Sequence, residues 1–311
     1  MRGLDAGALI ALPPFVKKYF GLFKQTFQEF LSDKVPRLGA ALAYYTIFSI
    51  APLLLIAIAI AGLVFGREAA QNGITHQLGS VLGTTAAKAV NDMVANAAKP
   101  KSGAIATIVG VVTLLLGASG VFGQLKDALN TIWDVEPEKS GGIFAMVKER
   151  FLSMAMVFGV GFLLLVSLVI DAAISAASDR FIPDSIATVA QLIQLVLSLG
   201  IVTLLFAMMF RYLPDIRIAW HDVWFGAALT SLLFVIGKFG LGIYLTKSAV
   251  DSSYGAAGSL VVLLLWIYYS AQILLFGAEF TQVYARSHGS HSGDRKAAEK
   301  EKQQLASVQA S

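Results

Sequence analysis

The 311-residue sequence contains no cysteine, which excludes disulfide bonds, thiolate metal sites and cysteine nucleophiles. Charged residues are also scarce, at 14% of the chain, whereas 56% of the residues are hydrophobic. This balance lies outside the range of an ordinary soluble domain and indicates that lipid is the main solvent of the chain. The four histidines stand alone or lie in a polar tail, so we predict neither a metal site nor any other cofactor.

Signatures of enzymes are absent from the sequence as well. It has no Walker-type phosphate-binding loop, no Gly-x-Ser-x-Gly elbow and no zinc-peptidase motif. The hydrophobic segments leave too little sequence for a separate soluble catalytic domain of normal size. We therefore predict that the protein is not an enzyme, and an intramembrane enzyme is the weakest of the alternatives.

What the sequence does contain is six hydrophobic stretches of about 20 residues or more, the length needed to cross ~30 Å of hydrocarbon. They predict an all-α, polytopic membrane protein with spans near 38–65, 104–123, 148–172, 186–210, 220–246 and 256–284. With these spans, 17 Lys and Arg residues fall on the side of both termini and six on the opposite side. The positive-inside rule then places both termini in the cytoplasm. The same pattern accounts for the net charge of +4, so we predict no nucleic-acid partner.

The chain divides into a segment 1–36, a membrane domain 37–285 and a polar tail 286–311 that we expect to be disordered. Aromatic residues recur at helical spacing between residues 15 and 31, which predicts an amphipathic helix. This helix either lies in the cytoplasmic interface or packs on the bundle. A further short helix is predicted at 84–98, on the outer side.

Pro52 lies in the middle of the first predicted span. It removes a backbone hydrogen bond and frees the carbonyl near Phe48, so we predict a kink. Tight packing around a bend is the simpler interpretation, and a gating hinge is the alternative.

Lys238 is the most informative charge within the spans, because it lies ~12 Å inside the outer end of the fifth one. A lysine at this depth can extend its ammonium group to the lipid headgroups. Alternatively, Lys238 faces the bundle interior, pairs with Asp171 and binds an anionic group of a substrate.

A glycine-rich run leads into the sixth span on the same side. Gly255 and Gly258 permit unusual backbone shapes, and Ser259 is placed to cap a helix whose free amides attract an anion. A tight helix hairpin that needs glycine is the more conservative interpretation.

Glu279 lies near the cytoplasmic end of the sixth span, where both the helix dipole and the apolar surroundings disfavour its charge. We expect Arg211, at the end of the fourth span, to pair with it. The pair is interpreted either as a structural clamp between helices or as part of a proton- or ion-coupling site.

Four tyrosines, Tyr44, Tyr45, Tyr268 and Tyr269, lie within the first and sixth spans. Buried hydroxyl groups need hydrogen-bond partners, so these side chains are predicted to face other helices or a polar cavity.

Several motifs occur in an order that is similar to a known family: Arg37–Pro52, Leu129–Trp133, Arg211–Asp215, Gly237–Lys238, Tyr254–Ser259 and Gly277–Glu279. Over roughly residues 30 to 285 the chain resembles the YihY/BrkB family of bacterial inner-membrane proteins. The resemblance implies a six-span protein. It also favours a functional over a purely structural role for four positions that coincide with the family pattern: Lys238, Gly255, Gly258 and Glu279. A ribonuclease label once attached to that family does not fit a chain without a metal-binding carboxylate cluster or histidine pair.

Two functional hypotheses remain. The first is a transporter or flippase for an amphipathic, anionic lipid or lipid-linked molecule, with Lys238 and the 255–259 segment receiving its headgroup. The second is a membrane scaffold or envelope assembly factor that binds partner helices through faces of small residues. Membrane lipids are the expected partners, and the sequence does not define an oligomeric state.

Overall fold

The computed structural model describes residues 14–97, 120–135, 187–247 and 258–290. These residues form helices and no strand, which confirms the all-α prediction for this part of the chain. The helices are α2 (Pro14–Ser32), α3 (Val35–Phe65), α4 (Arg67–Ala97), α7 (Ala187–Tyr212), α8 (Trp220–Lys247) and α10 (Gly258–His288), together with a helical segment at 120–132.

Three stretches in the described residues are long and apolar enough to cross a membrane: Val35–Ala59, Trp220–Tyr244 and Gly258–His288. A shorter apolar helix covers Val196–Tyr212. The spans predicted near 104–123 and 148–172 lie largely or wholly outside the described residues. The number of six spans and the cytoplasmic position of both termini therefore stay predictions.

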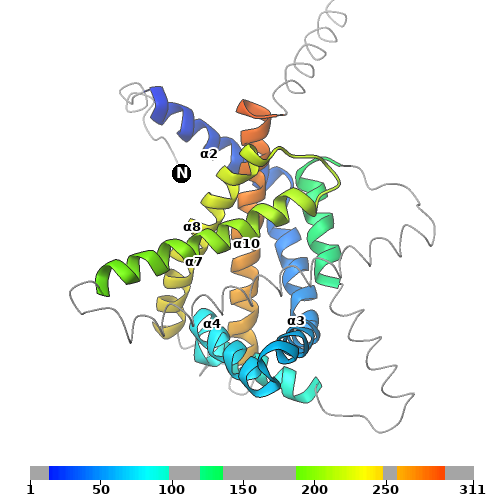
Figure 1. Cartoon of the computed structure of the whole chain (residues 1–311). Coiled ribbons are helices and arrows are strands. Elements are labelled where there is room, and N and C mark those ends of the chain that lie inside the picture. Colours follow the sequence, from blue (N-terminus) through cyan, green and yellow to red (C-terminus); the bar gives the residue numbers. More distant parts are fainter. Residues whose placement is uncertain (1–13, 98–119, 136–186, 248–257, 291–311) are drawn as a thin grey trace, which may run out of the picture.

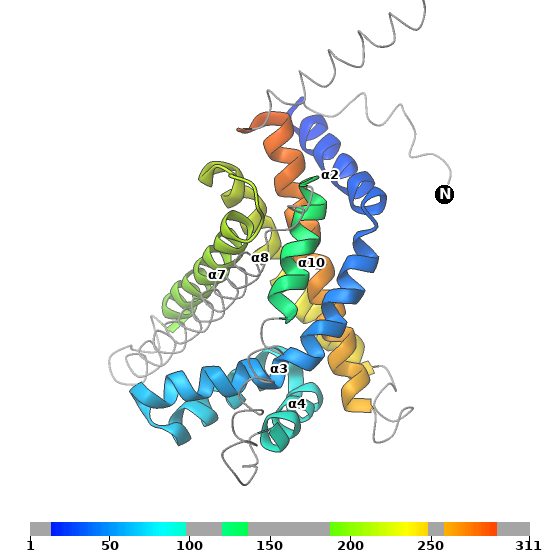
Figure 2. The same cartoon turned by 90° about the vertical axis from the view of Figure 1, so that its right-hand side faces the viewer.

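Helix α10 is the centre of the bundle. It contacts α2, α3, α4 and α8, and α7 packs on the far side of α8 (Figure 1). Helix α2 and the C-terminal end of α10 lie at one end of the molecule, whereas α4 lies at the other (Figures 1 and 2). We call these the inner end and the outer end, after the predicted orientation in the membrane.

Each end has its own apolar core. At the inner end the largest fully buried side chains come from the segment 120–132 and from α7 and α10, and include Leu129, Phe210 and Leu275. At the outer end Val90 and Leu263 join α4 to α10. Between helices in lipid such side chains stabilise each end mainly through van der Waals packing.

Helices α8 and α10 cross at two reciprocal glycine and threonine contacts. The side chain of Thr281 lies against Gly226, and that of Thr230 lies against Gly277. Each threonine hydroxyl donates a hydrogen bond within its own helix, at 2.8 Å to the carbonyl of Gly277 and at 2.7 Å to that of Gly226. The crossing thus buries two hydroxyl groups without leaving them unsatisfied, and it leaves no room for a larger residue at either glycine.

Helix α3 contains Pro52 and bends partway along its length (Figure 2). The bend agrees with the predicted kink, because proline cannot donate a hydrogen bond to the carbonyl one turn before it. The use of this bend as a hinge stays a prediction.

The amphipathic helix predicted between residues 15 and 31 is α2, and it packs on the bundle, one of the two roles expected for it. Its position in the cytoplasmic interface stays a prediction. Its buried side packs on α10, where the rings of Phe23 and Phe280 lie 5.4 Å apart and those of Phe30 and Phe276 lie 5.8 Å apart. Phe27 lies between Phe23 and Phe30 on the same helical face; its ring stacks on that of Phe30 and it is 56% exposed.

Two segment boundaries differ from the predictions. The helix predicted at 84–98 is only the second part of α4, because the chain is helical from Arg67 and breaks at Gly83, where φ is +78°. Ala70, Ile74, Leu78 and Leu82 recur every four residues in the first part and pack toward the outer core, a narrow apolar stripe that the prediction missed. Helix α10 continues to His288, two residues past the predicted start of the tail, and the rest of the tail lies outside the described residues.

Candidate functional site

Glu279 is fully buried on α10 near the inner end. Neither of its carboxylate oxygens has a hydrogen-bond partner among the described residues. Arg211, its predicted partner, instead places its guanidinium group 6.0 Å from the ring centre of Trp220. The predicted Glu279–Arg211 pair is therefore wrong: Arg211, in the last turn of α7, places its guanidinium group over the ring of Trp220.

Asp33 is the group that faces Glu279. It lies in the turn between α2 and α3, which is closed by Lys34 in the left-handed backbone conformation, with φ of 55°. The turn directs the Asp33 carboxyl back toward α10. Burial raises the pKa of Asp33, and the negative charges of Asp134 and Glu29 raise it further. Interaction with the Glu279 carboxyl and the charge of Arg286 oppose this rise only in part.

Two further residues of α10 lie on the Glu279 face, at spacings of three and seven residues. The Gln282 amide donates a 2.6 Å hydrogen bond to the carbonyl oxygen of Ile132. Arg286 forms a 2.8 Å ion pair with Asp134, which follows the segment 120–132 in a left-handed conformation with φ of 52°. The positive charge of Arg286 is thus neutralised by Asp134, and Glu279 has no cation to itself.

The arrangement of Asp33 and Glu279 favours one shared proton. Two ionised carboxylates are acceptors only and cannot hydrogen-bond each other. When one carries a proton it donates to the other, which both pairs the buried oxygens and removes one of two like charges. The site can therefore hold a proton in one state and release it in another.

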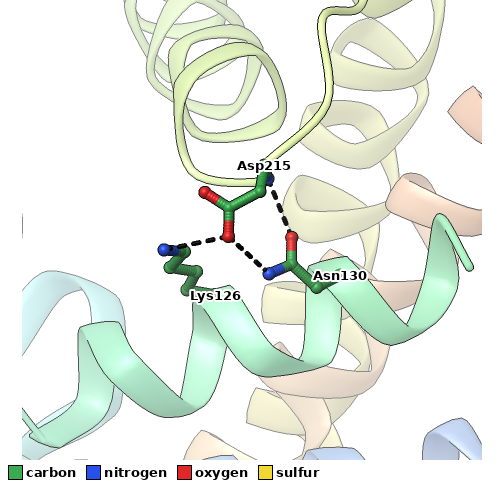
Figure 3. A network of polar contacts seen from close by, with 3 residues as sticks. All are labelled: Lys126, Asn130 and Asp215. Atoms are coloured by element: carbon green, nitrogen blue, oxygen red, sulfur yellow. Dashed lines mark hydrogen bonds and ion pairs between the residues drawn. The ribbon is translucent and has the colours of Figure 1, made fainter. Parts of the chain in front are cut away.

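A second polar network joins the segment 120–132 to the loop between α7 and α8 (Figure 3). Asn130 donates to the Asp215 carboxylate at 2.9 Å and accepts from the Asp215 backbone amide at 2.8 Å. Lys126 binds the same carboxylate oxygen at 2.9 Å. This network holds the inner ends of two predicted spans in a fixed register.

A third contact ties the start of α8 to the end of α10. Asp222 is fully buried and accepts hydrogen bonds from the backbone amide and the hydroxyl of Ser290, at 2.9 and 2.6 Å. Its other carboxylate oxygen lies 3.0 Å from a ring nitrogen of His221. Gly289 lies directly against this carboxylate and leaves no room for a side chain.

Lys238 is half-buried on α8 and forms no ion pair with any described residue. Its neighbour Gly237 packs under the ring of Tyr269 from α10. Asp171, the predicted partner of Lys238, lies outside the described residues, and so does Gly255.

The start of α10 differs slightly from the expected cap. The helix already includes Gly258, which is buried, so Ser259 lies in the first turn rather than before it. The predicted tyrosines lie near the surface: Tyr44 is 60% exposed and packs on the ring of Phe48, with 4.9 Å between ring centres, and Tyr268 is 36% exposed. The ring of Tyr45 touches Gly120.

Sequence analysis identified Glu279 but not the residues that define its surroundings. Asp33, Asp134 and Gln282 are polar residues without a distinctive pattern. Asn130 and Asp215, in contrast, lie within two of the motifs that the family resemblance rests on, and these motifs meet in space. No group of three or more histidine, aspartate or glutamate residues in the described segments is arranged to hold a metal ion.

Long apolar helices packed around a central helix, with buried polar contacts concentrated at one end, define an integral membrane protein of the helical-bundle class. Residues 26–302 match the sequence model of the family described as virulence factor BrkB, and the chain belongs to this family.

Its curated relatives are described only as membrane proteins. The chain is 25% identical over 273 residues to a UPF0761 membrane protein of Alteromonas mediterranea, covering 86% of this chain and 88% of that protein. A UPF0761 membrane protein of Pseudoalteromonas translucida is also 25% identical, over 86% of this chain and 87% of its own length. One of Pseudomonas aeruginosa is 27% identical, over 80% of this chain and 59% of its own, longer sequence. No solved structure matches the chain.

Proposed function

We propose that the protein is a proton-coupled membrane transporter that moves an amphipathic, anionic lipid or lipid-linked molecule between the leaflets. The observation that carries this proposal is the buried, unpartnered carboxylate of Glu279 against Asp33. Buried ionisable groups in membrane helices are costly and typically belong to ion or proton pathways.

The surroundings of Glu279 fit a protonation switch better than a structural clamp. A clamp pairs a carboxylate with a cation, but the groups that interact with Glu279 are the carboxylates of Asp33, Glu29 and Asp134. An uncompensated buried charge costs several kcal/mol, so a change in protonation has enough energy to shift helix packing. Helices α2, α3 and α10 meet near this site and are the elements that such a change moves.

Lys238 supports the anionic character of the substrate. It is half-buried and has no counter-ion in the described part of the chain, so it is open to pair with an anion. Lys238 lies on the outer half of α8, whereas Glu279 lies near the inner end of α10. We therefore assign substrate binding and proton exchange to different depths in the membrane.

The test is lipid movement in proteoliposomes that contain the full chain. Fluorescent phosphatidylglycerol is placed in both leaflets, and the outer label is quenched to follow movement from the inner leaflet. With a pH gradient we expect faster movement than in protein-free vesicles, and the gradient should have no effect on Glu279→Gln. Lys238→Ala should slow phosphatidylglycerol more than fluorescent phosphatidylcholine.

Glu68→Gln provides the matched control, because Glu68 is an exposed carboxylate on α4, away from the Glu279 cluster. It should behave like the unmodified protein. Equal rates for protein-containing and empty vesicles, or an unchanged response of Glu279→Gln to the gradient, contradict the proposal.

A further inference from the structure

A cavity of about 370 Å³ lies at the outer end, between the second half of α3 and the two parts of α4. Its size is within the range of sites that bind small molecules. The cavity shares no residue with the Glu279 cluster or with the predicted substrate site at Lys238.

The cavity exists because α4 folds back on itself. Gly83 breaks the helix with a positive φ of +78°, a conformation that other residues adopt only with strain. The two parts of α4 then lie close enough for the Thr75 hydroxyl to donate a 3.3 Å hydrogen bond to the Asn91 side chain, 16 residues away. Residues from both parts line the cavity.

The polar side of the lining is made of amide, hydroxyl and carboxylate groups. It consists of Gln71, Asn72, Thr75, Asn91 and Asp92. Amides and hydroxyls both donate and accept hydrogen bonds, as do the hydroxyl groups of a sugar or another polyol. None of the described lining residues is Lys, Arg or His, so an anionic group finds no counter-charge here and meets the negative charge of Asp92.

The apolar side of the lining points to a lipid rather than a free sugar. Leu54 and Ile58 line the cavity and belong to Val35–Ala59, one of the stretches able to cross a membrane. The polar wall lies on α4, which follows this stretch along the chain. This order of apolar and polar surface matches the order of chain and headgroup in a membrane lipid.

From this lining we infer that the cavity binds a lipid with an uncharged, polyhydroxylated headgroup, such as a glycosyl diacylglycerol. The headgroup hydroxyls bond to Asn72, Asn91 and Asp92, and the upper part of the acyl chains lies along Leu54 and Ile58. The site takes a different chemical group from the anion expected at Lys238. Binding here does not depend on proton coupling at Glu279.

The experiment measures lipid retention by the full chain. Nanodiscs are formed with equal amounts of phosphatidylcholine, phosphatidylglycerol and monoglucosyl diacylglycerol, and the protein is re-extracted in a detergent without sugar groups. Mass spectrometry then gives the lipid retained per chain. With one to two net hydrogen bonds to the sugar, the glucolipid should be enriched about tenfold over phosphatidylglycerol.

Variants locate the binding. Asn72→Leu and Asp92→Leu should each lower the glucolipid enrichment by about fivefold, the loss of roughly one hydrogen bond. His76→Ala is the matched control, because His76 is exposed on the same helix and does not line the cavity. Thermal melting checks folding, and Gln71→Ala, at an exposed position, replaces any variant that fails to fold.

Equal retention of the three lipids, enrichment of phosphatidylglycerol, or an equal loss in His76→Ala overturns the inference. The assay uses no pH gradient and leaves Glu279 intact. A negative result here thus leaves the transport proposal standing, and a failed transport assay leaves this site standing.

Discussion

The inner and outer ends of the molecule accommodate polar side chains in opposite ways. At the inner end polar side chains are buried and paired across elements, as in the contacts of Asn130 with Asp215 and of Asp222 with Ser290. Glu279 differs from these residues, because both of its carboxylate oxygens are buried without a hydrogen-bond partner among the described residues. At the outer end polar side chains line an open cavity next to an apolar wall.

The comparison distinguishes groups that hold the helices in one arrangement from groups that can exchange a proton or a ligand with the surroundings. Buried hydrogen-bonded networks fix one arrangement of helices, so a buried carboxylate with both oxygens unpaired marks a group that changes state. A cavity with exposed amides, in contrast, can accept a ligand without any change in the fold. Four predictions test this contrast, in order of decreasing effect.

The strongest effect is expected at the crossing of α8 and α10. Gly277→Ala places a Cβ atom against the hydroxyl and Cβ of Thr230, so the variant should lose about 1–3 kcal/mol of stability by overpacking. Gly240→Ala, on α8 with no atom near the added Cβ, should change the melting temperature little. Adding Thr230→Gly to Gly277→Ala should recover part of the loss. Equal melting temperatures for Gly277→Ala and Gly240→Ala contradict the close crossing.

A smaller loss is expected from the network at Asn130. Asn130→Ala removes two hydrogen bonds to the partly solvated Asp215 and should cost about 1–2 kcal/mol. Lys126→Ala should cost less than about 1 kcal/mol, because the Asp215 side chain is 51% exposed and water screens the ion pair. Chemical unfolding in detergent measures both, and the reverse order of effects is the contrary result.

At the outer end the critical backbone position is Gly83. Gly83→Ala should destabilise the fold of α4 by about 1 kcal/mol, because alanine is strained at a φ of +78°. Gly79→Ala, where an added Cβ meets nothing, is the control. Hydrogen exchange localised to 67–97 measures the effect, and faster exchange at the inner end instead is the opposite outcome.

The smallest effect is a pH dependence at Asp33. A raised pKa means that the folded state favours the protonated form, so its stabilising contribution is complete below the unfolded pKa, near 3.8. This contribution is lost as pH rises through the folded pKa. Asp33→Asn stays neutral, so its melting temperature should equal that of the unmodified protein near pH 4 and exceed it at neutral pH. A difference that is constant with pH, or that shrinks as pH rises, contradicts the raised pKa.

The elements that sequence analysis located are those with a strong local pattern. Helices α3, α7, α8 and α10 follow from long apolar runs, and α2 follows from its aromatic periodicity. The first part of α4 was missed although Ala70, Ile74, Leu78 and Leu82 recur every four residues, because this stripe is narrow and lies among polar residues. Its reversal depends on the backbone of a single residue, Gly83. Local pattern thus indicates which segments are helical but not how they fold back on each other.

Sequence analysis predicted one residue of the candidate site, Glu279, but not the residues that surround it. Glu279 is recognisable because a carboxylate within an apolar helix costs free energy whichever side of the helix it lies on. Its neighbours depend on tertiary contacts: the left-handed turn at Lys34 directs Asp33 toward α10, and the pair with Asp134 occupies Arg286. Arg211 was wrongly predicted as the partner of Glu279 because its predicted depth in the membrane matched. The sequence did not show that its side chain lies over the ring of Trp220.

The central claim is that Asp33 and Glu279 share a proton that can be released. Infrared difference spectroscopy across a pH titration measures this directly, because a protonated carboxylic acid has its own carbonyl stretch. We predict such a band at neutral pH in the unmodified protein, its loss in Glu279→Gln, and its shift in Asp33→Asn. Identical spectra for the unmodified protein and Glu279→Gln throughout the titration contradict the claim.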